Sequence, residues 1–253
     1  MRTVLALTRK ELEQYFASPI AYVVVACYLA LCAVFFYIYL GFYMQSVSQG
    51  AAMGQQTGDI SQSIVRPFLS NVSFFFLIIF PMLTMRLVAE EKKMGTYELL
   101  MTSPVSITQL VVGKYLGVVA FMLVTLLLTA IFPLVLRIFG HPDPGPILTG
   151  FLGLFLLGAA FLAIGLFCSS ITESQIVATV LSFVFLILFW VINWVSHSEQ
   201  WYGKLCQYVS IYERFDDFTK GILNLNDVFY YISFAFFALF ATGIVLQSQR
   251  WKS

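Results

Sequence analysis

The sequence is poor in charge. Asp, Glu, Lys and Arg make up 11% of its 253 residues, against roughly 25% in ordinary soluble domains. Hydrophobic residues make up 60%. They fall in long continuous runs and not in alternating ten-residue segments, which argues against an outer-membrane β-barrel. The formal net charge of +1 gives no indication of a nucleic-acid partner. Composition therefore predicts an all-α integral membrane protein.

The sequence also lacks the residues that catalysis and ion transport need. Its two histidines, His141 and His197, lie between apolar runs, and no GxSxG, HExxH or P-loop pattern occurs. The four cysteines show no CxxC spacing. No acidic residue lies in the middle of an apolar run, where an ion relay would place one. We therefore expect no catalytic residue, no metal and no cofactor bound by this chain.

Six apolar runs are long enough to cross a bilayer as helices. They lie at about residues 20–42, 67–87, 110–136, 147–167, 175–195 and 228–245. Glycines in the fourth run favour close helix packing. Gln, Ser and Gly predict a loop over residues 44–66, prolines predict a turn over residues 140–146, and Ser169–Ser174 predicts a tight polar turn. Residues 1–253 then form one transmembrane domain.

Residues 2–16 predict a helix that lies on the membrane surface. Val4, Leu12 and Tyr15 fall on one side of a helical wheel, and Lys10 and Glu13 on the other, as in helices that bury one face at the headgroup boundary. The alternative is an ordinary extension before the first span. Charged residues interrupt this segment early, so it does not resemble a signal peptide, and the first span is expected to remain as an anchor.

A second amphipathic segment covers residues 196–227, between the fifth and sixth spans. Its apolar residues recur at the spacing of one helical face. They are Ile211, Phe215, Phe218 and Ile222. Gly221 suits the end of this helix, and Asp227 is expected to cap the sixth span. We expect an amphipathic helix that docks at the membrane surface or dips into it.

The distribution of positive charge predicts the orientation. Six spans place both termini on one side of the membrane, together with residues 86–104. Nine Lys and Arg residues lie on that side, against five on the other. By the positive-inside rule both termini are cytoplasmic, and residues 196–227 are extracytoplasmic. The chain is expected to be a multi-pass protein of the cell (inner) membrane.

Residues 86–104 form a polar island between the second and third spans. Four consecutive charges, Glu90 to Lys93, predict that the chain leaves the membrane there. Gly95 and Thr96 indicate a break and a helix start, and Pro104 indicates a helix end. The residues alone allow two interpretations: a short helix that contacts a partner, or a solvated connector.

Two motifs resemble the permeases of the second (exporter) type of ATP-binding cassette (ABC) transporter. The first resembles their intracellular coupling helix and comprises Arg86, Glu90, Glu91, Gly95, Thr96, Glu98, Leu99, Leu100, Ser103 and Pro104. The second resembles their interface helix and comprises Arg9, Lys10, Glu11, Leu12, Tyr15, Phe16, Ser18, Pro19, Ile20, Ala21 and Tyr22. The resemblance is strongest to the branch with the gliding-motility and nitrous-oxide-reductase copper-processing permeases.

This resemblance implies re-entrant extracytoplasmic helices before the sixth span, over residues 210–228. It also implies a permease dimer, in which the chain pairs with itself or with a related chain, and two cytoplasmic ATPase subunits. The chain has no Walker motif, so ATP and Mg would bind to the separate ATPase. The helix at 2–16 and a coupling helix at about 95–103 would contact it, with a second coupling loop that includes Ser170, Thr172 and Glu173. Arg86, Glu90 and Glu91 would form a charge network with Arg9, Lys10 and Glu11, and Glu98 would make a first-turn contact.

The resemblance implies export of a substrate that the sequence does not identify. An alternative is a mechanical transducer or assembly subunit that uses ATP to act on an extracytoplasmic partner. A third is a channel, although no span carries a ring of charged residues. An auxiliary membrane protein with an extracytoplasmic domain is a further possible partner, besides the lipid bilayer.

Overall fold

The structure is a computed structural model that describes residues 2–53, 59–97, 105–140, 142–196 and 210–250. All regular structure in these residues is helical. The elements are α1 (Arg2–Ala17), α2 (Pro19–Met53), the π-helix η1 (Ser61–Val65), α3 (Arg66–Thr84), α4 (Arg86–Lys93), α6 (Ile107–Thr129), α7 (Ile131–Gly140), α8 (Pro144–Ile171), α9 (Gln175–Ser196), α11 (Ile211–Thr219) and α12 (Leu225–Arg250). Six stretches of helix in these residues are long and apolar enough to cross a membrane, which confirms the predicted number of spans.

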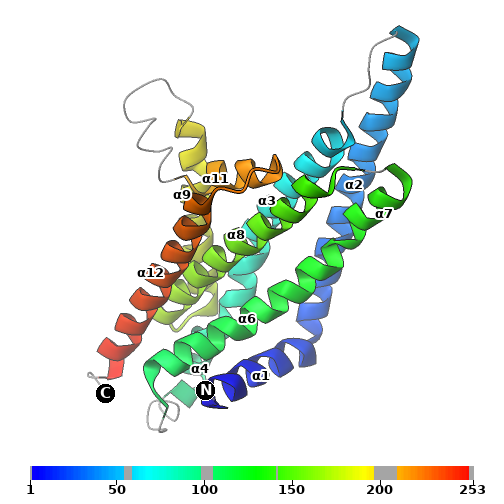
Figure 1. Cartoon of the computed structure of the whole chain (residues 1–253). Helices are drawn as coiled ribbons and strands as arrows, with labels where there is room; N and C mark the ends of the chain where they lie inside the picture. The colour runs from blue at the N-terminus through cyan, green and yellow to red at the C-terminus, as the bar shows by residue number, and fades with distance from the viewer. Residues whose placement is uncertain (1, 54–58, 98–104, 141, 197–209, 251–253) are drawn as a thin grey trace.

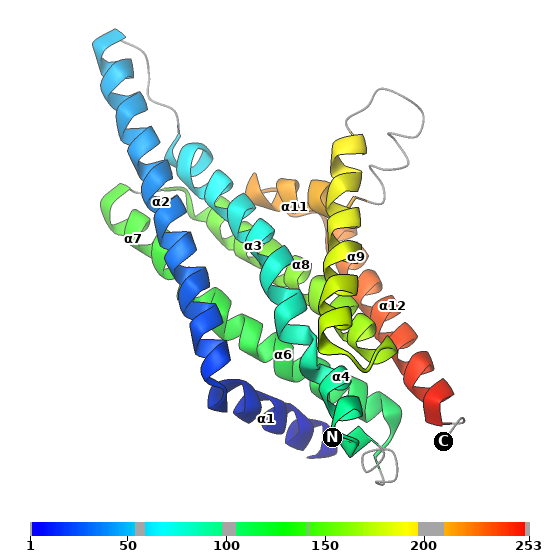
Figure 2. The same cartoon turned by 180° about the vertical axis from the view of Figure 1, so that it is seen from behind.

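The long helices run between two ends of the molecule. One end, named here the basal end, carries both chain termini with α1 and α4, and the opposite, distal end carries α11 (Figures 1 and 2). The spans that contain α3 and α8 each bury 67% of their most apolar window, whereas the spans of α2, α9 and α12 bury 11%, 17% and 22%. The helices α3 and α8 therefore form the centre, and the other three present apolar faces outward.

Glycines along α8 explain why it lies at the centre. A Cβ atom at Gly165 would lie 2.1 Å from Thr84 Oγ1 of α3, and one at Gly158 would lie 2.5 Å from the sulfur of Met122 in α6. Nearer the distal end, a Cβ at Gly153 would lie 2.7 Å from Phe218 Cβ of α11. No larger residue fits these positions without a shift, so the glycines let three helices approach the α8 backbone closely.

Two predicted loops are wrong in their extent. The helix α2 continues to Met53, through ten residues that the Gln/Ser/Gly content had assigned to a loop. Those residues contain no proline, and Gln, Met and Ala have good helix propensity. At the predicted proline turn, Pro144 and Pro146 lie in the first turn of α8, where proline is tolerated. Asp143 caps this turn by accepting a hydrogen bond from Gly145 N at 3.1 Å.

The polar island also differs from the prediction. The helix does not end before the four charges but continues as α4 to Lys93, after a break at Met85. Pro81 lies one turn before this break, and a proline inside a helix removes one backbone hydrogen bond and clashes with the preceding turn. Similarly, α8 extends to Ile171, so that Ser169 and Ser170 lie buried in its last turn and not in a loop.

The helix α11 has the predicted apolar face. Ile211, Phe215 and Phe218 are buried, whereas Ile222 lies beyond the helix and is exposed. Gly221 follows the helix with a φ of 87°, a left-handed conformation that glycine adopts without strain. Asp227 does not cap the sixth span: it lies inside the first turn of α12, and its Oδ1 pairs with Arg214 Nη1 at 2.7 Å.

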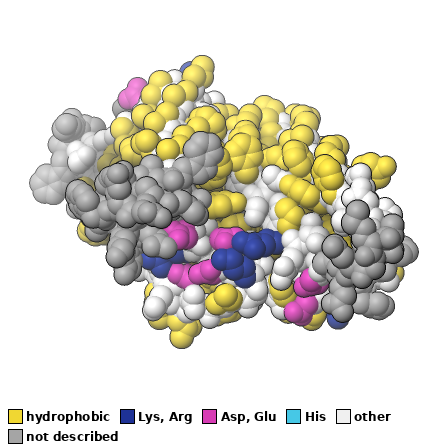
Figure 3. Space-filling view, turned by 90° about the horizontal axis from the view of Figure 1, so that it is seen from above, with side chains coloured by type: hydrophobic (Ala, Val, Ile, Leu, Met, Phe, Trp, Pro, Cys, Tyr) yellow, Lys and Arg dark blue, Asp and Glu magenta, His cyan; other side chains and the backbone are white. Residues whose placement is uncertain are grey.

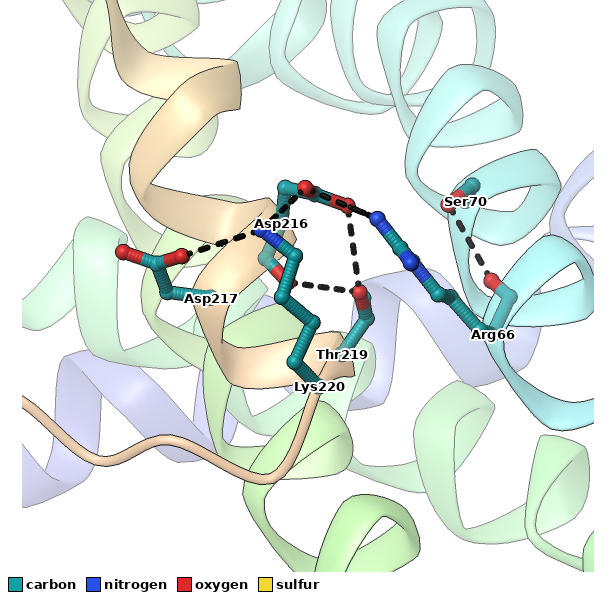
Figure 4. A network of polar contacts seen from close by, with 6 residues as sticks. All are labelled: Arg66, Ser70, Asp216, Asp217, Thr219 and Lys220. Carbon is teal, nitrogen blue, oxygen red and sulfur yellow. Dashed lines mark hydrogen bonds and ion pairs between the residues drawn. The ribbon is translucent and has the colours of Figure 1, made fainter. Parts of the chain in front are cut away.

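A charged cluster ties α11 to its neighbours at the distal end. Arg66 Nη2, at the start of α3, contacts both carboxylate oxygens of Asp216, at 2.8 and 3.0 Å, and Lys220 Nζ contacts the same carboxylate at 2.8 Å (Figure 4). Burial raises the pKa of the Asp216 carboxyl group, whereas the hydrogen bonds from Lys220 and Arg66 lower it. The lowering effects together outweigh the burial, so the pKa of Asp216 is below its usual value. Acidic and basic side chains lie side by side on this end (Figure 3).

Candidate functional site

The basal end contains a junction of three helices, α1, α4 and α6. The helix α1 packs closely on α6 because glycine occupies two α6 positions one turn apart. A Cβ atom at Gly113 would lie 2.7 Å from Leu7 Cβ, and one at Gly117 would lie 2.6 Å from Glu11 Cβ. Thr8 strengthens the contact by donating its hydroxyl to Gly113 O at 3.2 Å. The packed side of α1 therefore faces protein and not only the membrane surface.

Lys114 lies at the centre of the junction. Its Nζ contacts Glu11 Oε1 of α1 at 2.7 Å and Glu91 Oε1 of α4 at 2.8 Å. The three side chains are buried, with exposed fractions of 3% for Lys114, 6% for Glu11 and 13% for Glu91. Burial of a charge raises the free energy of the folded state unless the charge is paired. Here one cation from α6 pairs with two carboxylates. Removal of Lys114 would leave Glu11 buried without a counter-charge and Glu91 with only the more distant Lys10, whose Nζ lies 3.9 Å from Glu91 Oε1.

Tyr15 fixes the other end of α1. It is fully buried, donates its hydroxyl to Leu83 O at 2.7 Å, and stacks on Phe121 of α6 with ring centroids 4.9 Å apart. The guanidinium of Arg86 lies over its ring at 4.5 Å. Burial raises the pKa of Tyr15, so the phenol stays neutral and acts as a hydrogen-bond donor. Arg86 and Tyr15, both predicted site residues, are thus brought into contact.

Ser169 of α8 holds the start of α4. Its hydroxyl accepts hydrogen bonds from Val88 N and Ala89 N, both at 3.1 Å, and donates to Met85 O at 2.9 Å. These backbone groups flank the break between α3 and α4, where the regular helical ladder is interrupted. Lys92, farther along α4, donates to the carbonyl of Ser170. The helix α4 is therefore fixed to the end of α8 as well as to α6.

The end of α4 is set by Gly95. This residue has a φ of 71°, and its N–H donates to Lys92 O at 3.1 Å, which closes the helix with a left-handed cap. Thr96 donates its hydroxyl to Glu91 O at 3.2 Å. Residues 96 and 97 are helical again. The rest of the predicted coupling helix, with Glu98, Leu99, Leu100 and Pro104, lies outside the described residues.

The predicted charge network forms only in part. Lys10 Nζ lies 3.9 Å from Glu91 Oε1, whereas Arg9 pairs with Glu13 of its own helix at 2.7 Å. Glu11 does connect α1 to Glu91, but through Lys114. The carboxylate of Glu90 makes no hydrogen bond or ion pair with any described residue. Glu90 lines a cavity of about 310 Å³ with Glu11, Gln14, Arg86, Met94 and others.

The second predicted loop is shorter than expected. Only residues 172–174 separate α8 from α9. The hydroxyl of Thr172 accepts from Ser174 N at 3.2 Å, and Glu173 is exposed. Ser170 is buried. Its backbone carbonyl accepts hydrogen bonds from Lys92 and from Gln249 Nε2 of α12, the latter at 3.5 Å. Thr172 and Glu173 therefore remain available for a partner, whereas Ser170 is a packing residue.

Sequence reasoning missed Lys114 and Ser169 as site residues. The signal for Lys114 was present, because it is a lone charge four residues into the apolar run that begins at Leu110, and an ionisable residue in a span is a functional candidate by default. No local signal marks Ser169, because its partners lie about eighty positions earlier in the sequence.

The described residues contain no group of three or more His, Cys, Asp or Glu side chains that could hold a metal ion. The junction joins three helices from different parts of the chain by paired charges and close packing.

Comparison with known proteins identifies a family for the chain. No curated protein gives a significant match. A family profile described as "ABC-2 family transporter protein" matches residues 5–249, which include all six candidate spans and the whole basal junction. The match covers far more than half of the chain, and the chain therefore belongs to the ABC-2 transporter family.

Proposed function

We propose that this chain is the permease subunit of an ABC exporter, and that it couples ATP hydrolysis by a separate cytoplasmic ATPase to movement of a substrate across the membrane. The observation that carries the proposal is the pair of contacts from Lys114 to Glu11 and Glu91. They join the two segments that the motifs assign to the ATPase interface, α1 and the island, to a membrane span.

The proposed mechanism has two states of the ATPase. Closure of the ATPase around ATP displaces α1 and the segment after Gly95, and the junction passes this displacement to α6 through Lys114 and to α8 through Ser169. A ligand shifts a conformational equilibrium only by its differential affinity for the two states. The ATP-bound ATPase must therefore bind one arrangement of the junction more tightly than the other.

In the proposed assembly, the basal end and both termini lie on the cytoplasmic side of the inner membrane. ATP and Mg bind to the ATPase, and two permease copies form a dimer, identical or related. The exposed apolar faces of α2 and α9 are suited to lipid and to a second copy. The N-terminal motif favours the gliding-motility and copper-processing branch. The motility permeases often have an auxiliary membrane protein with an extracytoplasmic domain, and such a protein is a further candidate partner.

The coupling proposal is tested by ATP turnover in the complex reconstituted in vesicles with its ATPase. Glu90→Ala and Glu98→Ala are each expected to lower permease-stimulated turnover by roughly fivefold or more, while the ATPase still copurifies. Glu90 is a sharp test, because its carboxylate makes no hydrogen bond or ion pair with a described residue. Wild-type turnover in both variants would remove the assignment.

The orientation is tested separately by labelling with a membrane-impermeant thiol reagent. In a chain whose four native cysteines are replaced, Ile222→Cys should react from outside the cell and Thr96→Cys only after permeabilisation. Both positions are suited to this, because Ile222 is 48% exposed and Thr96 lies outside the spans. The reverse pattern would invert the topology.

A second candidate function is mechanical work on an extracytoplasmic partner without transport. The distal cluster favours it, because Arg66–Asp216 ties α11 to α3 and Arg214–Asp227 ties α11 to α12. A movement of the spans would thus reach the outer surface. Substrate accumulation in inverted vesicles separates the two functions: ATP-dependent uptake supports export, and ATP turnover that moves α11 without any uptake supports transduction.

A further inference from the structure

A small apolar cavity opens between α7 and the first turns of α8, at the distal end. Its volume is about 210 Å³, and its walls include Pro133, Leu134, Leu148 and Phe151. Leu134 and Leu148 are 55% and 71% exposed, so the cavity lies on an outward, membrane-facing side of two spans. Among the described residues that line it, Arg137 is the only charged one.

The walls of this cavity are held in place. The turn from α7 into α8 is fixed to the residues around η1, because Ser61 Oγ accepts a hydrogen bond from Asp143 N at 3.0 Å. On the other side of this turn, a Cβ atom at Gly140 would lie 3.3 Å from Ile60. Pro133 and Pro144 add stiffness, since proline fixes φ. The cavity is therefore a built feature of the helix pair and not a gap between mobile side chains.

Physical chemistry restricts what fills the cavity. Water is excluded, because an apolar cavity offers it too few hydrogen-bond partners. An empty cavity would forfeit dispersion contacts along its whole lining. The solvent of a membrane span is hydrocarbon, so the occupant that matches the lining is an acyl chain.

Arg137 indicates which lipid supplies that chain. It lies near the end of its candidate span, which finishes at Ile138, and there an arginine extends its charged group toward the headgroups. No described residue makes an ion pair with its guanidinium. Guanidinium groups bind phosphate through paired, charge-assisted hydrogen bonds. Arg137, which no described residue neutralises, lies next to a cavity that can hold part of an acyl chain. This combination fits a lipid whose headgroup carries net negative charge.

We propose that this cavity binds one anionic phospholipid, with its phosphate on Arg137 and one acyl chain between α7 and α8. The site lies in the leaflet at the distal end, away from the basal junction. Because a bound chain would fill the space between the third and fourth spans, the lipid is expected to stabilise this helix pair.

The test is native mass spectrometry of the full chain released from mixed micelles with phosphatidylglycerol or with phosphatidylcholine of the same acyl chains. We expect one phosphatidylglycerol retained per chain. Arg137→Gln should weaken that binding by roughly tenfold or more and leave phosphatidylcholine binding unchanged. Arg2→Gln, which removes an exposed charge at the opposite end, is the matched control. Free glycerol phosphate should not compete, because it lacks the acyl chain.

A second variant tests the cavity itself. Leu148→Trp places a large ring into the cavity from an exposed position, so it leaves the core intact, and it should abolish lipid retention while the unfolding midpoint in detergent stays unchanged. The proposal is overturned if Arg137→Gln retains phosphatidylglycerol as the wild type does, if both lipids bind equally to the wild type, or if Leu148→Trp retains lipid normally.

Discussion

Lys114→Met is the most informative single substitution in this chain. Methionine has a similar length and no charge, so the variant removes the cation and keeps most of the packing. At an effective dielectric constant of about 20, two unit charges about 4 Å apart attract by roughly 4 kcal/mol, and Lys114 makes two such pairs. Desolvation of the three groups offsets much of this. Removal of one partner of a buried pair typically costs roughly 3–5 kcal/mol, and that is the expected loss here.

The loss is measurable as the free energy of unfolding in mixed micelles titrated with a denaturing detergent. The matched control is Arg9→Met, which breaks an ion pair of the same 2.7 Å length whose side chains are 82% and 65% exposed. This control should cost less than about 0.5 kcal/mol. A triple variant, Lys114→Met with Glu11→Gln and Glu91→Gln, should recover most of the loss, because no buried charge remains unpaired. Equal losses in Lys114→Met and Arg9→Met would refute the reasoning.

Three further predictions concern the contacts around the junction and the distal cluster. Ser169→Ala leaves two backbone N–H groups of α4 without a partner and should cost about 1–3 kcal/mol of unfolding free energy. Gly117→Val forces α1 off α6 and should cost about 1–3 kcal/mol, whereas Gly243→Val, where an added Cβ meets nothing within 4 Å, should be nearly neutral. Asp216 has a lowered pKa, so its contribution to stability is full at neutral pH and is lost as the pH falls through the folded pKa, below the usual aspartate value of about 3.9. Asp216→Asn should therefore be less stable than the wild type at neutral pH, with a difference that shrinks in acid; a difference independent of pH down to about 2 would contradict this.

The architecture of the spans was largely predictable, because hydrophobic runs of this length have few other structures open to them. The apolar face of α11 was also predictable, since Ile211, Phe215 and Phe218 follow helical spacing and all three are buried. The four glycines of the fourth apolar run are predicted packing positions, and the structure shows each against a neighbouring helix: Gly150, Gly153, Gly158 and Gly165.

The ends of the helices were less predictable. The apolar run predicts an end of the second span at about residue 87, whereas the candidate span continues through α4 to Lys93. The charges of α4 are tolerated because Lys114 and the carbonyl of Ser170 pair with two of them. Such partners lie far away in sequence, and hydrophobicity alone does not reveal them.

The candidate site was predictable in its location and not in its connections. The motifs drew attention to Glu11, Tyr15, Arg86 and Glu91, which the structure brings into one junction. The structure connects α1 to the island through Lys114 of α6. One partner of Lys114, Glu11, lies 103 positions earlier in α1. The other partner, Glu91, lies in α4. A helical wheel of α1 places Glu11 on one face but gives no information about a cation from α6.

The central claim is that ATP-driven movement enters the spans through the junction of α1, α4 and α6. Its most direct test is ATP turnover of the reconstituted complex that carries Lys114→Met, at a temperature where the variant is folded and still binds the ATPase. We predict permease-stimulated turnover lowered by roughly fivefold or more. Turnover at the wild-type rate in a fully assembled Lys114→Met complex would contradict the account.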